Sequence, residues 1–327
     1  NPPFGHSGEK AIGNYFLNGN GKRFKTQLTN KEYQDLIDFE GNANGFKILS
    51  ESKNGVEGGL RLSFATLGAF MKYPKESLPK NPTSHIADKK YGVFQSEKYF
   101  FGAVAQELGL QKRGEQKDLS YHRHPLAFLV EAADDICYTI IDFEDGINLG
   151  LIEEEFALEY LINLVKENIN TKKYTSLIKS SDRLAYLRSL AINTLVAEAA
   201  AVFIENEENI LNGEFTTSLL DKSKYKAQVA DIIKISVQKI YKSTEVIDKE
   251  IAGYKILNTL LDVYTTAVEN VFNDSLTPFD SLVLNDFSFN TNEKYTTYQY
   301  LIESCNYLSR LTDGNAMLIF QKINGNL

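Results

Sequence analysis

Cysteine is scarce in this sequence: its 327 residues contain two, Cys137 and Cys305, and neither stands in a paired CxxC spacing. This argues against a cysteine-based zinc site and fits a reduced compartment. Long apolar runs are also missing. The longest, such as residues 195–204, are broken by Glu or Lys well short of the roughly 20 residues that a membrane span needs. No signal peptide is visible, so we expect a cytoplasmic protein without a membrane partner.

An excess of positive charge is the third absence. The 35 Lys and Arg are outnumbered by 43 Asp and Glu, which gives a net charge of -8. Because affinity for duplex nucleic acid comes from clustered Lys and Arg, this charge argues against nonspecific nucleic-acid binding as the main function. A polyphosphate substrate is not excluded, provided that a divalent metal or a few lysines supply positive charge locally.

Helical periodicity dominates what is there. From Pro125 onward, apolar residues recur at spacings of three and four, through 126–141, 184–204, 229–240, 251–271 and 298–320. No linker or internal repeat is visible. The sequence therefore predicts an all-α fold and a single domain over residues 1–327. Residues 41–60 are rich in Gly and Asn, and there we predict a small irregular or β insertion.

The segment 124–142 carries the first candidate site. At 100° per residue, Asp134 is predicted to border an apolar stripe formed by Val130, Cys137 and Ile141, with Asp135 turned toward the polar side. A carboxylate at a core boundary must be paired, hydrogen-bonded or bound to metal. Asp134, Tyr138 and Asp142 also recur every four residues. That row is either a metal-and-substrate face or the solvated edge of an amphipathic helix.

The chain start carries the second candidate. His6 and Glu9 lie three residues apart at the apparent start of a helix, so they share a face. A carboxylate there can orient an imidazole or raise its basicity, which makes a general acid or base near neutral pH. The alternative is a capping histidine with a glutamate that the helix dipole favours.

Two lysines at the ends of helical runs are candidates for phosphate contact. They stand in Lys72-Tyr73-Pro74 and in Lys89-Lys90-Tyr91-Gly92. The alternative is that both are solvated charges. His122 and His124 form an HxH pattern, which indicates either a metal site or, more simply, the lead-in to a helix.

Five motifs in order resemble one family. They are NPPFGHSGE at 1–9, FEGNANGF at 39–46, ATLGAFMKYP at 65–74, HPLAFLVEAADDICYTIIDFED at 124–145 and YLSRLTD at 307–313. In sequence and approximate spacing they resemble the bacterial dGTP triphosphohydrolases of the HD-domain superfamily. The resemblance implies a helical HD-type fold.

The resemblance also implies a divalent metal, Mg or Mn, with another transition metal acceptable. In the family, His-Asp-Ile-Gly directly precedes the first motif, and its His and Asp, with one earlier His, are metal ligands. None of these three is in this sequence. We therefore expect Asp134 to be the fourth ligand, its partners to lie upstream of Asn1, and an N-terminal segment to be absent.

The other site residues follow by position in the motifs. His6 and Glu9 match the family's catalytic pair. The positions that match substrate contacts are Tyr138 and Asp142 for the deoxyribose, Lys72, Tyr73 and Lys90 for the triphosphate, Asn42 for the pocket, and Glu250 for the base. No residue between 275 and 290 was matched to the family's base-recognising arginine, so the preferred deoxynucleoside triphosphate stays open.

The implied reaction is hydrolysis at the α-phosphorus, which releases a deoxynucleoside and tripolyphosphate. Two alternatives remain: an HD-type phosphohydrolase of nucleoside monophosphates or other phosphoesters, and a non-catalytic, nucleotide-binding regulatory protein. By resemblance we also expect a homo-oligomer, a hexamer in the family, with single-stranded nucleic acid as a possible regulator.

Overall fold

Helices make up nearly all of the regular structure. The computed structural model describes residues 2–51, 60–80, 82–115, 117–286 and 295–326. Within these ranges the only β pairing is three isolated bridges, Lys75 to Ser120, Glu76 to Val93 and Lys112 to Tyr121. The all-α prediction is confirmed.

The helices, with α for α-helix and η for 3₁₀ helix, are α1 Gly5–Leu17, η1 Asn20–Gln27, α2 Asn30–Ile37, α3 Gly41–Ser50, α4 Phe64–Phe70, η2 Ile86–Asp88, η3 Gln95–Glu97, α5 Lys98–Glu107, α6 Pro125–Asn148, α7 Glu154–Val165, α8 Thr171–Ser176, α9 Ser180–Glu205, α10 Glu207–Leu211, α11 Leu219–Lys222, α12 Lys226–Lys239, α13 Thr244–Phe272, α14 Pro278–Asp286, α15 Thr297–Ser309 and α16 Asp313–Ile323.

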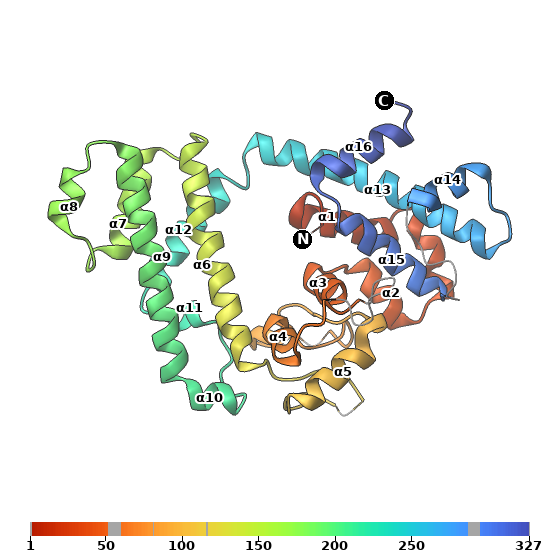
Figure 1. Cartoon of the computed structure of the whole chain (residues 1–327), viewed down its shortest axis with the longest axis horizontal. Coiled ribbons are helices and arrows are strands. Elements are labelled where there is room, and N and C mark those ends of the chain that lie inside the picture. The colour runs from red at the N-terminus through yellow and green to blue at the C-terminus, as the bar shows by residue number, and fades with distance from the viewer. Residues whose placement is uncertain (1, 52–59, 81, 116, 287–294, 327) are drawn as a thin grey trace.

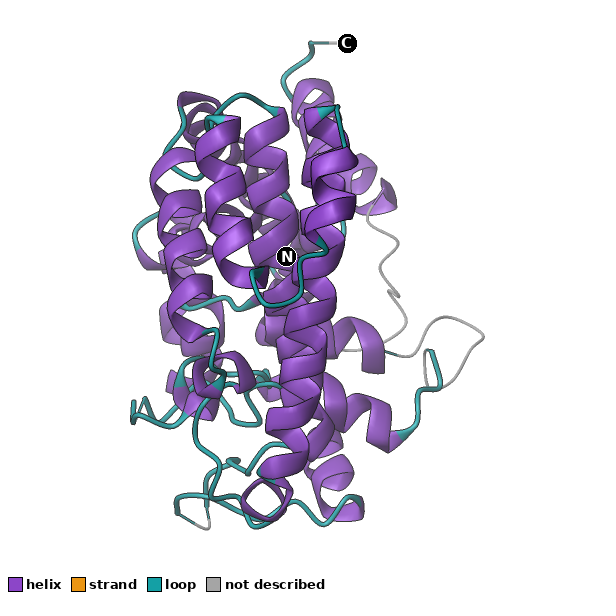
Figure 2. Cartoon of the chain, turned by 90° about the vertical axis from the view of Figure 1, so that its left-hand side faces the viewer, coloured by secondary structure: helices purple, strands orange, loops and turns teal. Residues whose placement is uncertain are grey.

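The helices form two parts that lie side by side in Figure 1. One part holds α6 to α12, where α9 packs against both α6 and α7 (Figure 1), and Figure 2 shows its long helices side by side. Its core includes Phe143, Leu187 and Leu195, all fully buried. The other part combines the start of the chain with its end, because α1 packs on α13 and α13 packs on α15. Its core includes Phe16 and Leu257.

A third, smaller core supports the segment that precedes α6. Phe46 of α3, Leu67 of α4, and Phe101 and Val104 of α5 are buried together there. The ring of Phe46 meets that of Phe101 edge-on, with centroids 5.4 Å apart. Division into three cores does not test the single-domain prediction for residues 1–327, which stays a prediction.

Residues 41–50 are helical, so the prediction of an irregular or β insertion was wrong for this stretch. The Glu40 side chain caps α3 by accepting a hydrogen bond from the backbone N–H of Asn42 at 3.2 Å. Gly45 serves close packing, because a Cβ there would lie 2.7 Å from the Phe70 ring. Residues 52–59, the rest of the predicted insertion, lie outside the described residues.

The sequence analysis expected no segment long and apolar enough to span a membrane, and helix α9 departs from that expectation. By length and composition alone it is the one helix, in the part of the chain that the structure describes, that is apolar enough to do so. One third of its apolar window, 33%, is buried inside the protein. It packs against α6, α7 and α11. A single helix of this kind is weak evidence for a membrane span.

Two buried polar clusters connect the beginning of the chain to its end. Asp35 of α2 is fully buried and accepts hydrogen bonds from the Tyr298 hydroxyl at 2.6 Å, the Gln95 backbone N–H at 2.7 Å and the Ser77 hydroxyl. Burial raises the pKa of Asp35 to about 7. Lys47 of α3 is paired with Glu97 at 3.1 Å and with Glu303 of α15 at 2.6 Å.

We predict that Asp35→Ala lowers the free energy of unfolding by about 3 kcal/mol, because it leaves buried donors without their acceptor. Urea unfolding measures this. The matched control is Asp38→Ala, since Asp38 is 47% exposed in its ion pair with Lys80 and should contribute less than about 1 kcal/mol. Equal losses in the two variants would contradict the role assigned to Asp35.

Candidate functional site

A tight turn sets the start of α1. Phe4 and Gly5 both have left-handed backbone, with φ of 64° and 60°, and the Gly5 N–H donates to the Pro2 carbonyl at 3.0 Å. Gly8 allows the turn to fold back on the helix, because a Cβ there would lie 2.0 Å from the Pro3 carbonyl oxygen. This turn holds His6 and Glu9 in the first turns of α1.

His6 and Glu9 meet a cluster that reaches α1 from two other segments. Lys90 Nζ lies 3.9 Å from Glu9 Oε2 and 3.0 Å from Glu40 Oε1. Glu40 also accepts from the Asn42 side-chain amide at 2.7 Å. The structure therefore brings four predicted residues, His6, Glu9, Asn42 and Lys90, to one place.

The electrostatics of this cluster favour proton exchange near neutral pH. Burial, and then the neighbouring Glu40, raise the pKa of Glu9 to about 7. Glu9 is 7% exposed, and its Oε1 is buried without a hydrogen-bond partner. Desolvation, and then Lys90, lower the pKa of His6, so its imidazole is neutral at pH 7.

A second cluster lies between the end of α4 and α6. Lys72 Nζ is 2.6 Å from Asp134 Oδ2. The segment is fixed by Arg123, which donates from Nε to the Lys72 carbonyl at 2.5 Å and is paired with buried Glu131 at 2.6 Å. The guanidinium also lies 5.5 Å from the centre of the Tyr73 ring. Desolvation is the main cause that raises the pKa of Tyr73, and the negative charges of Glu131, Glu40 and Asp135 raise it further. The Tyr73 phenol therefore lies near acidic residues of both clusters.

The predicted orientation of α6 was wrong. Its buried stripe is Phe128, Ala132, Ile136, Ile140 and Phe143. Val130, Cys137 and Ile141 are exposed instead, and the Asp134 side chain is 70% exposed. Asp135 is the more buried carboxylate, and burial raises its pKa to about 6. Both stripes of α6 are apolar, so spacing could not select between them, and the bulkier one with its two Phe rings packs into the core.

Further along the open face of α6, Tyr138 and Asp142 contact one residue that follows α12. The Tyr241 ring stacks on the Tyr138 ring, with centroids 5.7 Å apart and an interplanar angle of 23°. The Tyr241 hydroxyl donates to Asp142 Oδ2 at 2.6 Å. The face of α6 from Asp134 to Asp142 is thus largely exposed and includes apolar side chains. Tyr241 contacts this face at Tyr138 and Asp142.

The HxH pattern is a helix lead-in, as the simpler interpretation held. His124 is the N-cap of α6 and accepts from the Leu126 N–H at 3.2 Å, with Pro125 in the first turn. Among residues 2–51, 60–80, 82–115, 117–286 and 295–326, no three His, Cys, Asp or Glu side chains form a group that could hold a metal ion. Asp134 alone does not make a metal site.

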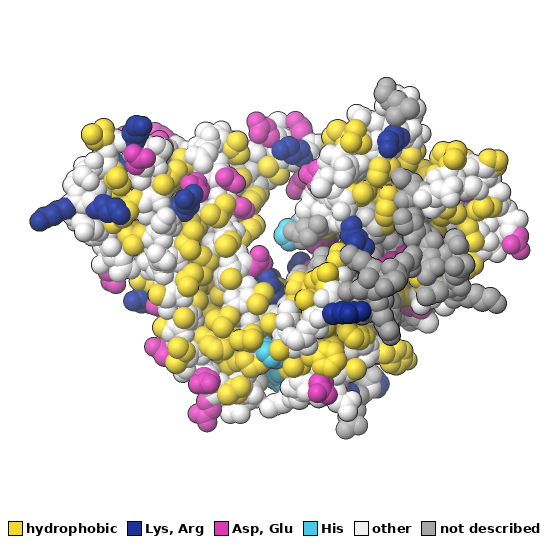
Figure 3. Space-filling model, in the orientation of Figure 1, with side chains coloured by type: hydrophobic (Ala, Val, Ile, Leu, Met, Phe, Trp, Pro, Cys, Tyr) yellow, Lys and Arg dark blue, Asp and Glu magenta, His cyan; other side chains and the backbone are white. Residues whose placement is uncertain are grey.

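A notch separates the two parts of the molecule in Figure 3, with a histidine on one wall and acidic and basic side chains near its base. The start of α13 crosses beside this notch in Figure 1. Glu250 lies on that exposed start and forms no hydrogen bond or ion pair with the site side chains described above. Its placement in the site stays a prediction.

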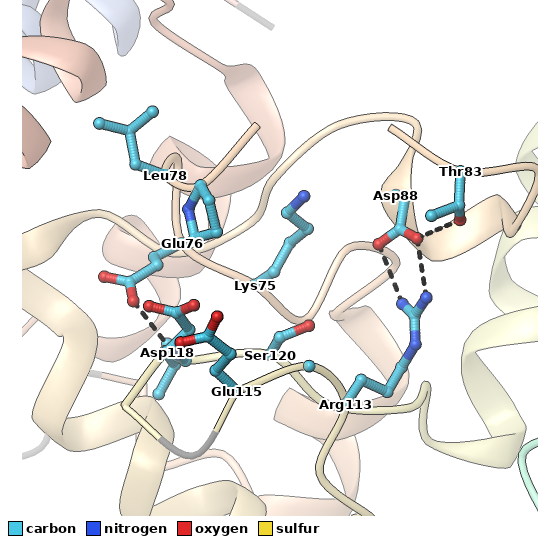
Figure 4. Close-up of a pocket in the computed structure, with 12 residues that line it drawn as sticks. Lys75, Glu76, Leu78, Thr83, Asp88, Arg113, Glu115, Asp118 and Ser120 are labelled. Atoms are coloured by element: carbon cyan, nitrogen blue, oxygen red, sulfur yellow. Dashed lines mark hydrogen bonds and ion pairs between the residues drawn. The ribbon is translucent and has the colours of Figure 1, made fainter. Parts of the chain in front are cut away.

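A cavity of about 340 Å³ lies elsewhere, between segments 75–88 and 113–120 (Figure 4). Most of the charged side chains that line it already form ion pairs. Arg113 is paired with Asp88 at 2.7 Å, and Glu76 is paired with Lys31 at 2.7 Å and with Lys98 at 3.1 Å, two lysines outside the lining. It contains none of the predicted site residues. We therefore place the candidate site at the notch.

Known proteins resemble this chain over nearly its whole length. No protein-family model matches it. A deoxyguanosinetriphosphate triphosphohydrolase-like protein of Synechocystis is 34% identical over 335 residues, covering 99% of this chain and 74% of the relative. One from Pseudomonas aeruginosa is 30% identical with the same coverage. The chain belongs to the deoxyguanosinetriphosphate triphosphohydrolase family. The deoxyguanosinetriphosphate triphosphohydrolase of Yersinia enterocolitica is 30% identical over 81% of the chain and 58% of its own length.

Three residues of this triphosphohydrolase-family site were not predicted. Glu40 stands inside the FEGN motif, which carries the resemblance but gives no local sign that this carboxylate belongs to the site. Arg123 directly precedes the α6 cap and had no signal beyond its charge. Tyr241 lies 99 residues after Asp142, its partner. No local pattern connects residues so far apart.

The open face of α6 makes a prediction about its thiol. Cys137 is exposed, whereas Cys305 is fully buried and burial raises its pKa. We expect an aromatic disulfide reagent to titrate one thiol quickly in the native protein and both in denaturant. Cys137→Ser should remove the fast phase. A fast phase that persists in this variant would contradict the orientation of α6.

Proposed function

We propose that this protein hydrolyses dGTP, or another deoxynucleoside triphosphate, to a deoxynucleoside and tripolyphosphate. The observation that carries the proposal is the 34% identity, over 99% of the chain, with a relative named for dGTP triphosphohydrolysis. The cluster of His6, Glu9 and Lys90 supports it, because it offers proton exchange and positive charge side by side.

Hydrolysis at the α-phosphorus sets two tasks for the chain. Water forms a bond to the phosphorus and loses a proton, and the 5′ oxygen of the leaving deoxynucleoside gains one. The neutral imidazole of His6 is suited to accept a proton, and Glu9, with a pKa of about 7, exchanges protons readily at neutral pH. The three phosphates leave together as tripolyphosphate.

The remaining side chains bind the substrate in this proposal. Lys72, Tyr73 and Lys90 contact the triphosphate, and Asn42 is a polar contact of the pocket beside Glu40. Tyr138 and Asp142 contact the deoxyribose, which the stacking of Tyr241 on Tyr138 supports. Glu250 contacts the base. Positive charge near the phosphates offsets the charge that develops as the bond breaks.

A divalent metal, Mg or Mn, remains part of the proposal, with another transition metal acceptable, and with Asp134 as the one carboxylate that we assign to it. The exposed position of Asp134 leaves it accessible, but a single carboxylate does not hold a divalent ion. No step above is therefore assigned to the metal. The proposed setting is the cytoplasm, which the unpaired Cys137 and Cys305 support. A hexamer, and regulation by single-stranded nucleic acid, are proposed on family resemblance alone.

The products test the proposal directly. Incubation of the protein with dGTP and Mn should give deoxyguanosine and tripolyphosphate, resolved by anion-exchange chromatography. His6→Ala and Asp134→Ala should lower kcat by about 100-fold or more. Asp145→Ala is the control, since Asp145 is exposed on the same helix. Release of dGMP and pyrophosphate, or failure to turn over any deoxynucleoside triphosphate, would refute the proposal.

One observation favours a second function, the hydrolysis of nucleoside monophosphates. Both proposed phosphate-binding lysines are already paired with carboxylates, Lys72 with Asp134 at 2.6 Å and Lys90 with Glu40 at 3.0 Å. A monophosphate would need neither of them.

Lys90→Ala separates the two functions. If the triphosphate binds Lys90, this variant should raise the KM for dGTP by about tenfold and leave the KM for a monophosphate unchanged. Lys166→Ala, an exposed lysine at the end of α7, is the control. An unchanged KM for dGTP in Lys90→Ala would favour the monophosphate function.

A further inference from the structure

Two buried carboxylates share one ammonium beside His6. Glu9 and Glu40 are each 7% exposed, and Lys90 Nζ lies 3.9 Å from the first and 3.0 Å from the second. If both were ionised, the group would hold two negative charges and one positive charge away from water, which is unfavourable. Glu40 has further partners in the Asn42 N–H and amide, at 3.2 and 2.7 Å. Glu9 Oε1 has none among the described residues. Glu9 is therefore the carboxylate of the two that is more easily protonated.

The charged groups that act on Glu9 are few. Among the described residues they are Glu40, which raises the pKa of Glu9, and Lys90, which lowers it, and the Gly41 N–H donates a hydrogen bond to Glu9. Charged side chains on the other elements packed against α1 are engaged elsewhere: Asp262 of α13 with Tyr15, Arg23 of η1 with Glu269, Asp35 of α2 with Tyr298, and Asp313 of α16 with the Phe4 N–H. Lys90 is thus the only cationic side chain among the groups that act on Glu9.

We propose that Glu40 is a positioning residue that holds Lys90 against Glu9, and that a bound triphosphate draws this ammonium away, so that Glu9 takes up a proton from solvent. The inference rests on the proposed function, because it uses the assignment of Lys90 to the triphosphate. Its consequence is that substrate binding itself converts Glu9 to its acid form, beside the histidine, before the bond is broken. No covalent bond changes in this step, and the proton comes from the buffer.

The test is isothermal titration calorimetry of the full chain with inorganic tripolyphosphate, in buffers of different ionisation enthalpy. The probe contains no nucleoside to be released. In the free protein the pKa of Glu9 is about 7, so Glu9 is only partly protonated at pH 7. Binding should therefore be accompanied by the uptake of a fraction of a proton more than in Glu9→Gln, a variant that corrects for protons exchanged by the polyphosphate itself.

Two variants separate positioning from a structural role. Lys90→Ala removes the cation that lowers the pKa of Glu9, so Glu9 should already be protonated in the free variant. The excess proton uptake on binding tripolyphosphate should then be lost. Glu40→Gln should remove a neighbouring negative charge and so lower the pKa of Glu9, which should shift the acid limb of the pH profile of kcat/KM to lower pH. Glu107→Gln, an exposed carboxylate on α5, is the matched control and should behave as the unmodified protein does.

The outcomes distinguish this inference from the proposed function. Proton uptake equal in the unmodified protein and in Glu9→Gln would overturn the inference, even if dGTP is hydrolysed to tripolyphosphate. An unshifted pH profile in folded Glu40→Gln would also overturn it. If the excess uptake is found but no deoxynucleoside triphosphate is turned over, the inference stands and the proposed function fails.

Discussion

One ammonium is shared by two carboxylates that the fold buries at the start of α1, and the site is built around this constraint. The glycine-dependent turn before α1 brings in Glu9, the cap of α3 brings in Glu40, and segment 89–92 brings in Lys90. Each carboxylate would be costly without the shared cation. Three distant segments must therefore come together for the two carboxylates to be buried beside a cation.

The sequence predicted the long helices α6, α9, α12 and α13 and the region of α15 and α16, because the 3.6-residue repeat of apolar side chains is a local property. It failed where two local patterns competed. On α6, two apolar stripes satisfy the same repeat, and only packing against α9 and α12 selects the one with Phe128 and Phe143. In α3, glycine and asparagine indicated a loop, but Glu40 caps the helix and Gly45 fits under the Phe70 ring. Both outcomes depend on contacts between segments far apart in sequence.

The candidate site was predictable to the extent that motifs carried it. His6, Glu9, Asn42 and Lys90 lie close together, and Lys72 lies against Asp134, while the roles assigned to them stay predictions. Glu40, Arg123 and Tyr241 were missed, because each acts by holding another site residue and not through a pattern of its own. The metal has no complete set of ligands among the described residues, so its assignment stays a prediction.

Helix α13 has a consequence for motion between the two parts. Its 29 residues extend roughly 43 Å. Up to Ala252 it is largely exposed, and from Gly253 it is anchored by the core around α1. The chain passes between the two parts twice, at the lead-in to α6 and at the turn before α13. A change in the width of the notch would therefore require backbone rotation at both places, together with movement of α4 where it packs against α6.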